Sequence, residues 1–144
     1  MKSGLFAWPL RVYYEDTDVS GVVYHANYLR YFERARTEWL RTLGYSQERL
    51  RHEAGIAFTV SSLEVLFRSP ARLDDELEAT VQIGERRRAS LRFDQTLRQR
   101  SNPSHILATA QARVACVDMA RFKPCPLPED FLARVGEFAV GSAS

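Results

Sequence analysis

The sequence contains little cysteine, little lysine and no long hydrophobic run, and each shortage excludes a class of protein. Its two cysteines, Cys116 and Cys125, make no disulfide framework, so we expect a reduced, cytoplasmic protein. No segment approaches the ~20 apolar residues of a membrane span, and residues 1–11 lack the apolar core of a signal peptide. We therefore expect no membrane insertion.

An excess of charge of one sign is also missing. The formal net charge is +2, too small to indicate nucleic-acid binding, and no aromatic stacking platform accompanies the arginine run 86–88. We therefore expect no nucleic-acid partner. The hydrophobic fraction of 45% and the charged fraction of 26% are those of an ordinary globular protein. The 144 residues are most simply one domain, spanning residues 1–144.

Several catalytic and metal-binding motifs are missing as well. There is no Gly-x-Ser-x-Gly elbow, which excludes a serine hydrolase of the α/β type. The histidines His25, His52 and His105 lack the spacing of metal ligands, so we expect no metal site. A glycine-rich phosphate loop is also absent from the sequence.

One long helix is predicted over residues 26–43, ending where Gly44 supplies a C-terminal cap. At ~100° per residue its aromatic and aliphatic side chains cover about half of the circumference. That arc is broad for a surface helix, so we expect a sheet to wrap around it. Arg36 falls inside the arc, and we expect it to pair with Glu33 or with an acid of a second subunit.

Alternation with a period of two predicts four successive strands after the helix, within residues 62–67, 77–83, 90–97 and 106–114. A further strand is predicted at residues 8–15. The expected fold is therefore α+β, an antiparallel sheet wrapped around one long central helix. Short helices are predicted at residues 47–53 and 129–135, and the small residues of the last strand suggest a close approach by the long helix. Because such a sheet leaves edge strands open, we expect a homodimer or homotetramer.

The richest segment is residues 11–27, where a β-rich run leads through an acidic turn into the predicted helix. This order places a carboxylate beside the free N–H groups of a helix N-terminus. A base and an electrostatic clamp for a developing oxyanion would share one small space, which is the arrangement that acyl transfer needs.

Two other interpretations of the acidic turn fail. The pattern Asp16-x-Asp18-x-Ser20-Gly21 matches the opening of an EF-hand calcium loop, but the twelfth position, which needs a bidentate carboxylate, holds Asn27. The same Asp-x-Asp is found in haloacid-dehalogenase-type phosphatases, which need alternating β/α units that one long helix cannot supply.

Residues 12–28 and the helical run Tyr31–Arg36 resemble the hot-dog-fold thioesterases of the 4-hydroxybenzoyl-CoA thioesterase family. The likeness is closest to the Tol–Pal-associated acyl-CoA thioesterase branch and spans roughly residues 10–130, including the stretch Pro70–Leu77 and the proline-rich stretch near Pro124–Pro128. The resemblance implies that the helix is the "sausage" and the sheet the "bun", in agreement with the periodicity.

The resemblance also implies roles for individual residues. Asp18 corresponds to the catalytic carboxylate, acting as general base or as nucleophile; the alternative is that Asp18 only caps the loop or helix. Backbone N–H groups around Tyr24 and His25 would polarise the thioester carbonyl. The His25 side chain would orient Asp18, a water molecule or the substrate, or serve as a structural cap.

Substrate-binding candidates are Tyr14, Asn27, Arg68, Arg72 and Arg88. Tyr14 is a candidate for a pocket hydrogen bond, although a strand tyrosine is more often packed, and Asn27 is expected to make a local cap or turn contact. The three arginines are candidates for the phosphates of coenzyme A, although an arginine-rich turn is usually only solvated.

The expected activity is hydrolysis of acyl-CoA, or of acyl carrier protein thioesters, to free acid and thiol. No cofactor is expected, because coenzyme A is part of the substrate. The alternative is a non-catalytic acyl-thioester binding protein or a scaffold associated with an envelope complex. The sequence leaves the acyl group open between an aromatic ring and a short or medium fatty chain.

Overall fold

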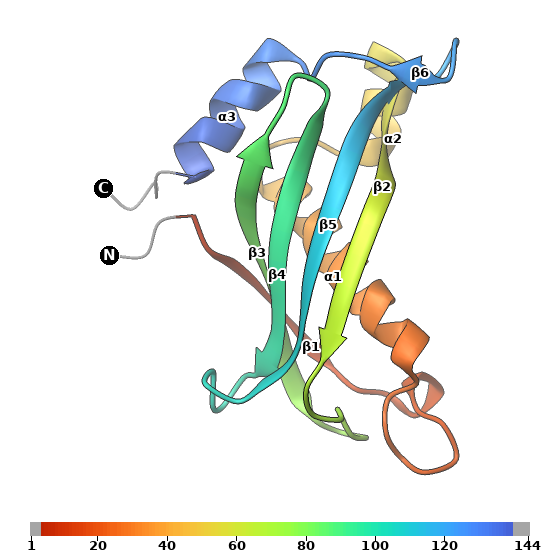
Figure 1. The fold of residues 1–144 in the computed structure, drawn as a ribbon, viewed down its shortest axis with the longest axis vertical. Coiled ribbons are helices and arrows are strands. Elements are labelled where there is room, and N and C mark those ends of the chain that lie inside the picture. Colours follow the sequence, from red (N-terminus) through yellow and green to blue (C-terminus); the bar gives the residue numbers. More distant parts are fainter. Residues whose placement is uncertain (1–3, 140–144) are drawn as a thin grey trace.

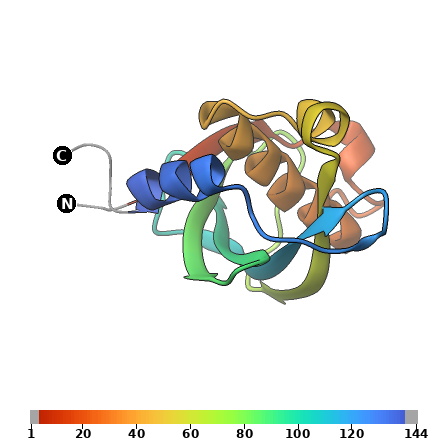
Figure 2. The ribbon, with the colours of Figure 1, turned by 90° about the horizontal axis from the view of Figure 1, so that it is seen from above.

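The computed structural model describes residues 4–139, in which a curved antiparallel sheet wraps one long helix (Figures 1 and 2). The strands are β1 (Phe6–Arg11), β2 (Ile56–Phe67), β3 (Glu76–Arg86), β4 (Ser90–Gln99), β5 (Ile106–Asp118) and β6 (Lys123–Pro124). The helices are η1 (Tyr14–Asp16), α1 (His25–Thr42), α2 (Gln47–Arg49), η2 (Leu50–Ala54) and α3 (Glu129–Ala139). The α+β architecture predicted from the periodicity is confirmed.

The strand order in the sheet is β1-β3-β4-β5-β2, and the short β6 pairs with β5. Each of these pairings is antiparallel. Strand β2 lies at one edge and carries a bulge between Val60 and Ser62. It begins at Ile56, earlier than the predicted start at residue 62, because the alternation of side chains breaks at the bulge.

The first strand is shorter than predicted. The sequence analysis placed a strand over residues 8–15, but β1 ends at Arg11 and residues Tyr14–Asp16 form a 3₁₀ turn. The turn forms because the Asp16 carboxylate accepts a hydrogen bond from the Tyr13 N–H at 2.9 Å. A local side-chain contact of this kind overrides the β propensity of two tyrosines.

Helix α1 lies on the concave side of the sheet, where Figure 2 shows the strands curving around it. It ends as predicted at Gly44, whose φ of +91° suits a residue without a side chain. It packs most extensively against β3, and less against β1 and β4. The expectation that the small residues of β5 mark the close approach is therefore wrong. The alanines Ala108 and Ala112 instead lie opposite the bulky Leu97 and Phe93 of β4.

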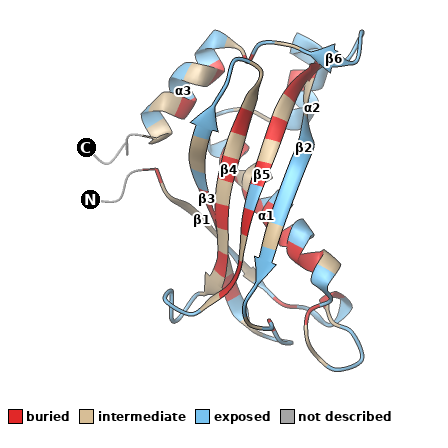
Figure 3. Ribbon diagram, in the orientation of Figure 1, coloured by how far each residue is buried: buried red, intermediate tan, exposed pale blue. Residues whose placement is uncertain are grey.

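The core lies between α1 and the sheet, and its centre is Trp39. The indole ring meets the rings of Phe93 on β4, and of Phe131 and Phe138 on α3, edge to face, with centroid separations of 5.2, 6.4 and 5.5 Å. Helix α3 is thereby fixed across one end of the sheet. Figure 3 shows buried and less buried residues alternating along β4 and β5, as expected for a sheet with one polar face.

No helix within residues 4–139 is both long enough and apolar enough to cross a membrane.

Candidate active site

The acidic turn forms a small hairpin that precedes α1. Thr17 and Val23 form an isolated antiparallel bridge, and the Asp18 N–H donates to the Val22 carbonyl at 3.0 Å. At the tip, the Gly21 N–H donates to the Asp18 carbonyl at 3.1 Å, and Gly21 has a φ of +81°. This left-handed conformation favours glycine and explains why one closes the turn. Asp18 is thus held at the tip of a closed hairpin.

The Asp18 carboxylate is exposed and accepts two hydrogen bonds from Ser20. The Ser20 hydroxyl donates to Asp18 Oδ1 at 2.5 Å, and the Ser20 N–H donates to the same oxygen at 2.8 Å. The hydroxyl contact, followed by the backbone contact, lowers the pKa of Asp18. The group is therefore an anion at neutral pH, and its Oδ2 atom has no hydrogen bond within the described residues.

Of the two N–H groups predicted to polarise a substrate carbonyl at the N-terminus of α1, one is free. The Tyr24 N–H donates to the Asp16 carbonyl at 3.0 Å, so it is not available for this role in the described structure. The N–H groups of His25 and Ala26, in the first turn, have no acceptor within the described residues. The free N–H groups beside the hairpin are therefore those of His25 and Ala26.

The side chains of Tyr24 and His25 lie on the surface beside these groups. Both are exposed, and their ring centroids are 4.4 Å apart with planes inclined by 43°. The His25 imidazole makes no hydrogen bond to Asp18 in the described structure, so its proposed orienting role rests on the family resemblance alone.

The Asn27 side chain contacts the acidic turn. Its Nδ2 atom donates to Asp16 Oδ1 at 2.7 Å, and both residues are buried. The role of Asn27 in substrate binding stays a prediction. The Tyr31 hydroxyl is buried nearby; burial, with the Asp16 carboxylate as the second cause, raises the pKa of Tyr31.

The predicted arginines divide into two groups. The segment that carries Arg68 and Arg72 lies against the hairpin, because the Val23 N–H donates to the Ala71 carbonyl at 2.8 Å and Val22 bridges to Arg72. Arg88 lies in the β3–β4 turn, at the end of the sheet opposite the hairpin (Figure 1). One subunit therefore does not bring Arg88 to Asp18.

Tyr14 does not enter a pocket of this chain. Its side chain is 82% exposed, and its carbonyl accepts the Thr17 N–H at 3.2 Å within the 3₁₀ turn. Any contact between Tyr14 and a substrate would have to be made at the protein surface or with a second subunit present.

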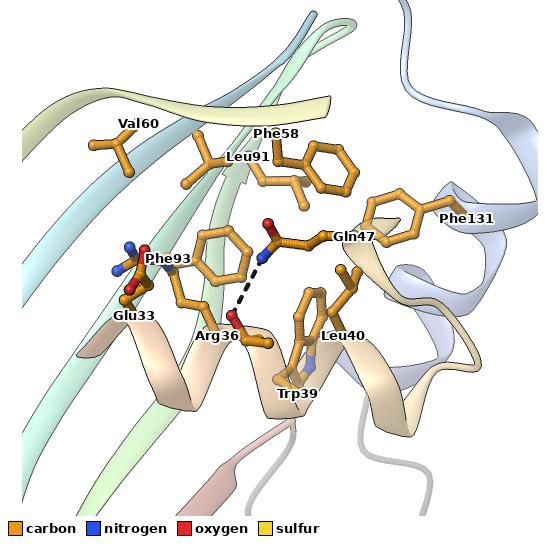
Figure 4. Close-up of a pocket in the computed structure, with 12 residues that line it drawn as sticks. Glu33, Arg36, Trp39, Leu40, Gln47, Phe58, Val60, Leu91, Phe93 and Phe131 are labelled. Atoms are coloured by element: carbon orange, nitrogen blue, oxygen red, sulfur yellow. Dashed lines mark hydrogen bonds between the residues drawn. The ribbon is translucent and has the colours of Figure 1, made fainter. Parts of the chain in front are cut away.

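A cavity lies between α1 and the sheet, toward the C-terminal half of the helix (Figure 4). Its apolar wall includes Trp39, Leu40, Phe58, Leu91, Phe93 and Phe131. Its polar side includes Arg36, which was expected to pair with Glu33 or with an acid of another subunit. Within the described residues the guanidinium instead donates to Gln95 Oε1 at 2.9 Å, and burial lowers the pKa of Arg36.

Within residues 4–139, the cavity between α1 and the sheet is lined by neither Asp18 nor His25. The same residues contain no group of three histidine, cysteine or acidic side chains placed to hold a metal ion.

The contact between Ser20 and Asp18 was not predicted from the sequence, although the spacing of two residues is typical of an Asx turn.

The chain matches known proteins along almost its whole length. The model of the thioesterase-like superfamily matches residues 12–135. The acyl-CoA thioester hydrolase YbgC of Escherichia coli O6:H1 is 47% identical over 133 residues, 92% of this chain and 97% of the relative. The acyl-CoA thioesterase YbgC of Haemophilus influenzae is 44% identical over 89% of this chain and 92% of the relative.

A solved structure supports the same relationship. The 1,4-dihydroxy-2-naphthoyl-CoA thioesterase from Synechocystis superposes with a TM-score of 0.86 at 25% identity, covering 93% of this chain and 97% of the other. The helix wrapped by a sheet is therefore the hot-dog fold, and the chain belongs to the thioesterase-like superfamily.

Proposed function

We propose that this protein hydrolyses acyl-CoA thioesters to a free acid and coenzyme A, with Asp18 as the catalytic carboxylate. The observation that carries the proposal is the placement of an ionised, exposed carboxylate on a closed hairpin that leads directly into the free N–H groups of α1. The relatives named acyl-CoA thioesterases support the choice of substrate class.

The geometry suits two routes. As a general base, Asp18 takes a proton from water while the water oxygen attacks the thioester carbonyl. As a nucleophile, Asp18 attacks the carbonyl itself, and water then hydrolyses the mixed anhydride. In both routes the oxyanion accepts hydrogen bonds from the His25 and Ala26 N–H groups, the C–S bond breaks, and the thiolate leaves and is protonated. These groups and water suffice, so we propose that no cofactor takes part.

The complete site is proposed to lie between two subunits. In one chain the Asp18 hairpin faces solvent, and the long edge strand β2 exposes several apolar side chains beside it. A second copy placed against β2 would cover that edge and give the hairpin a facing wall. The pantetheine arm would then lie along the interface, with Arg68 and Arg72 near enough to the hairpin to meet the phosphates.

The test is release of free thiol from a panel of aliphatic and aromatic acyl-CoAs. We expect turnover by the wild-type protein and a decrease in kcat of about 10²–10⁴-fold in Asp18→Asn. Asp118→Asn is the matched control, because Asp118 also accepts the N–H two residues on, from Ala120 at 2.9 Å, but lies at the end of β5. Equal kcat values for Asp18→Asn and wild type would exclude the proposed role of Asp18.

The rival function is binding of an acyl thioester without turnover. Tight binding of an acyl-CoA with no thiol release from any member of the panel would support it. An acyl carrier protein thioester belongs in the same panel as an alternative carrier of the acyl group.

The cellular setting is a separate proposal. We propose a reducing, cytoplasmic location, which the two unbonded cysteines support. Association with the Tol–Pal envelope complex is proposed from the family resemblance alone, and co-purification of the protein with components of that complex would test it.

A further inference from the structure

We infer that the buried carboxylate of Asp16 is a positioning residue, which sets the orientation of the Asp18 hairpin relative to the amides of α1 through a hydrogen bond to Asn27. The inference rests on the proposed function for its meaning in catalysis. It concerns a side chain that takes no part in the proposed chemistry and is only 4% exposed.

Asp16 is connected to three neighbouring segments at once. Its Oδ1 atom accepts the Asn27 side-chain amide at 2.7 Å, and its Oδ2 atom accepts the Tyr13 N–H at 2.9 Å. Its main-chain carbonyl accepts the Tyr24 N–H at 3.0 Å. Asp16 thus joins the residue that precedes the 3₁₀ turn, the residue that precedes α1, and the first turn of the helix.

The hydrogen bonds of Asp16 lie at the base of the hairpin, next to α1. Asp16 immediately precedes Thr17, which forms the base of the hairpin with Val23, and Asp18 follows at the tip. The hairpin tip is held by its internal hydrogen bonds and by the segment 71–73, whose Leu73 N–H donates to the Gly21 carbonyl at 3.2 Å. Its base is held directly to α1 through the buried Asp16–Asn27 contact, which therefore helps to set its direction relative to the helix.

The Asp16 carboxylate is placed to accept hydrogen bonds. The carboxylate receives two N–H donors and lies beside the N-terminus of α1, where the helix dipole stabilises a negative charge. In this contact Asn27 donates and Asp16 accepts. Asn27→Asp places two acceptors opposite each other, and Asp16→Asn keeps the contact only if the Asn27 amide turns over to accept. Exchanging the two side chains restores a donor and an acceptor with the direction reversed.

Exchanging the side chains of Asp16 and Asn27 gives a variant that tests the contact directly. In Asp16→Asn/Asn27→Asp, the new amide at position 16 can accept the Tyr13 N–H and donate to the new carboxylate at position 27. That carboxylate is in the first turn of α1, where a negative charge is favourable. The net charge of the protein is unchanged by the exchange.

The experiment measures kcat and KM for Asp16→Asn, Asn27→Asp and the double variant with the best acyl-CoA substrate. We expect Asn27→Asp to lose at least about 10-fold in kcat with a smaller change in KM, Asp16→Asn to lose less, and the double variant to recover to within about 3-fold of wild type. The matched control is Asp118→Asn/Asn102→Asp, which makes the same chemical exchange at two sites outside the hairpin. It should leave kcat unchanged.

Wild-type kcat in Asn27→Asp, or a double variant as slow as Asn27→Asp while still folded, would overturn the inference. Hydrogen exchange of the amides from Thr17 to Tyr24 gives a readout independent of activity. It should accelerate in Asn27→Asp and return toward wild type in the double variant. If the wild type releases no thiol, the proposed function fails, and the exchange rates alone decide on the positioning role: unchanged rates would refute it.

Discussion

The behaviour of Asp18 depends on one neighbouring hydroxyl. The Ser20 hydroxyl is the largest cause of the lowered pKa of Asp18, and its oxygen lies 2.5 Å from Oδ1. A carboxylate with a lowered pKa keeps its charge as the pH falls, so activity that needs the charge persists further into the acid range. We therefore expect the Ser20 hydroxyl to set the acid limit of the proposed reaction, which is the pH below which activity is lost.

Replacing Ser20 by alanine should move that limit. Without the hydroxyl the pKa of Asp18 rises, so the carboxylate is protonated at a higher pH and kcat/KM declines earlier on acidification. The measurement is the pH profile of kcat/KM for Ser20→Ala and wild type. Ser104→Ala removes a similar hydroxyl contact, to Asn102 at 2.8 Å, and serves as control. An acid limb at the same pH in Ser20→Ala would contradict the assignment.

The two cysteines should differ in reactivity although their sulfur atoms are only 3.4 Å apart. Burial, followed by the contact with Cys125, raises the pKa of Cys116 to about 12, whereas Cys125 is partly exposed. Because the thiolate is the reactive form, iodoacetamide at pH 8 should add one label to the folded protein, on Cys125, and two after unfolding. Mass spectrometry with Cys125→Ser as control checks this. Faster labelling of Cys116 would contradict it.

Among the elements, β4 is joined to α1 by one buried amide. The Nε2 atom of the Gln95 side chain donates to the Phe32 carbonyl of α1 at 3.0 Å and to the Thr80 carbonyl of β3 at 3.2 Å. Its Oε1 accepts the Arg36 guanidinium. Gln95, which is 3% exposed, thus satisfies three groups on two elements, α1 and β3.

Replacing Gln95 by leucine should destabilise the fold. The change leaves the Arg36 guanidinium and the Phe32 carbonyl without their partner, and an unsatisfied buried polar group costs about 1–3 kcal/mol. We expect the free energy of unfolding in urea to fall by at least about 2 kcal/mol. Gln111→Leu, at an exposed position of β5, should change it by less than about 0.5 kcal/mol. Equal stabilities of the two variants would contradict this account.

Periodicity predicted most of the elements because it reports which face of each is buried. The long helix, the four later strands and the stop at Gly44 follow from spacing and composition alone. The end of β1 and the bulge in β2 did not, because they depend on single contacts such as the bond from the Tyr13 N–H to Asp16. Local propensity carries no information on a side chain that turns back onto its own backbone.

The site was predictable in part for the same reason. The resemblance and the order of turn and helix indicated Asp18 and the start of α1. Which N–H groups are free could not be read from the sequence, because the Tyr24 N–H is taken by the Asp16 carbonyl only once the hairpin has folded. The place of Arg88, at the far end of the sheet, depends on the path of the strands and not on the charge pattern.

At the scale of the whole molecule, the edge strand β2 is the main unsatisfied feature. Figure 3 shows it exposed along most of its length. Its exposed apolar side chains are Val60, Leu63, Leu66 and Phe67. A long edge of this kind is a template for pairing with another strand, and a second copy of the chain provides an identical one.

A charge in the middle of β2 should therefore separate the subunits. Leu63→Lys places like charges near each other if two copies of β2 pair about a two-fold axis, and sedimentation or light scattering should show a monomer where the wild type is a dimer or tetramer. Met119→Lys is a matched control, because Met119 is 38% exposed and Leu63 is 40% exposed. Since the Asp18 hairpin of one chain faces solvent, the Leu63→Lys monomer should also lose thiol release while keeping its folded spectrum. A fully active monomer would show that Asp18 and the α1 amides need no second subunit.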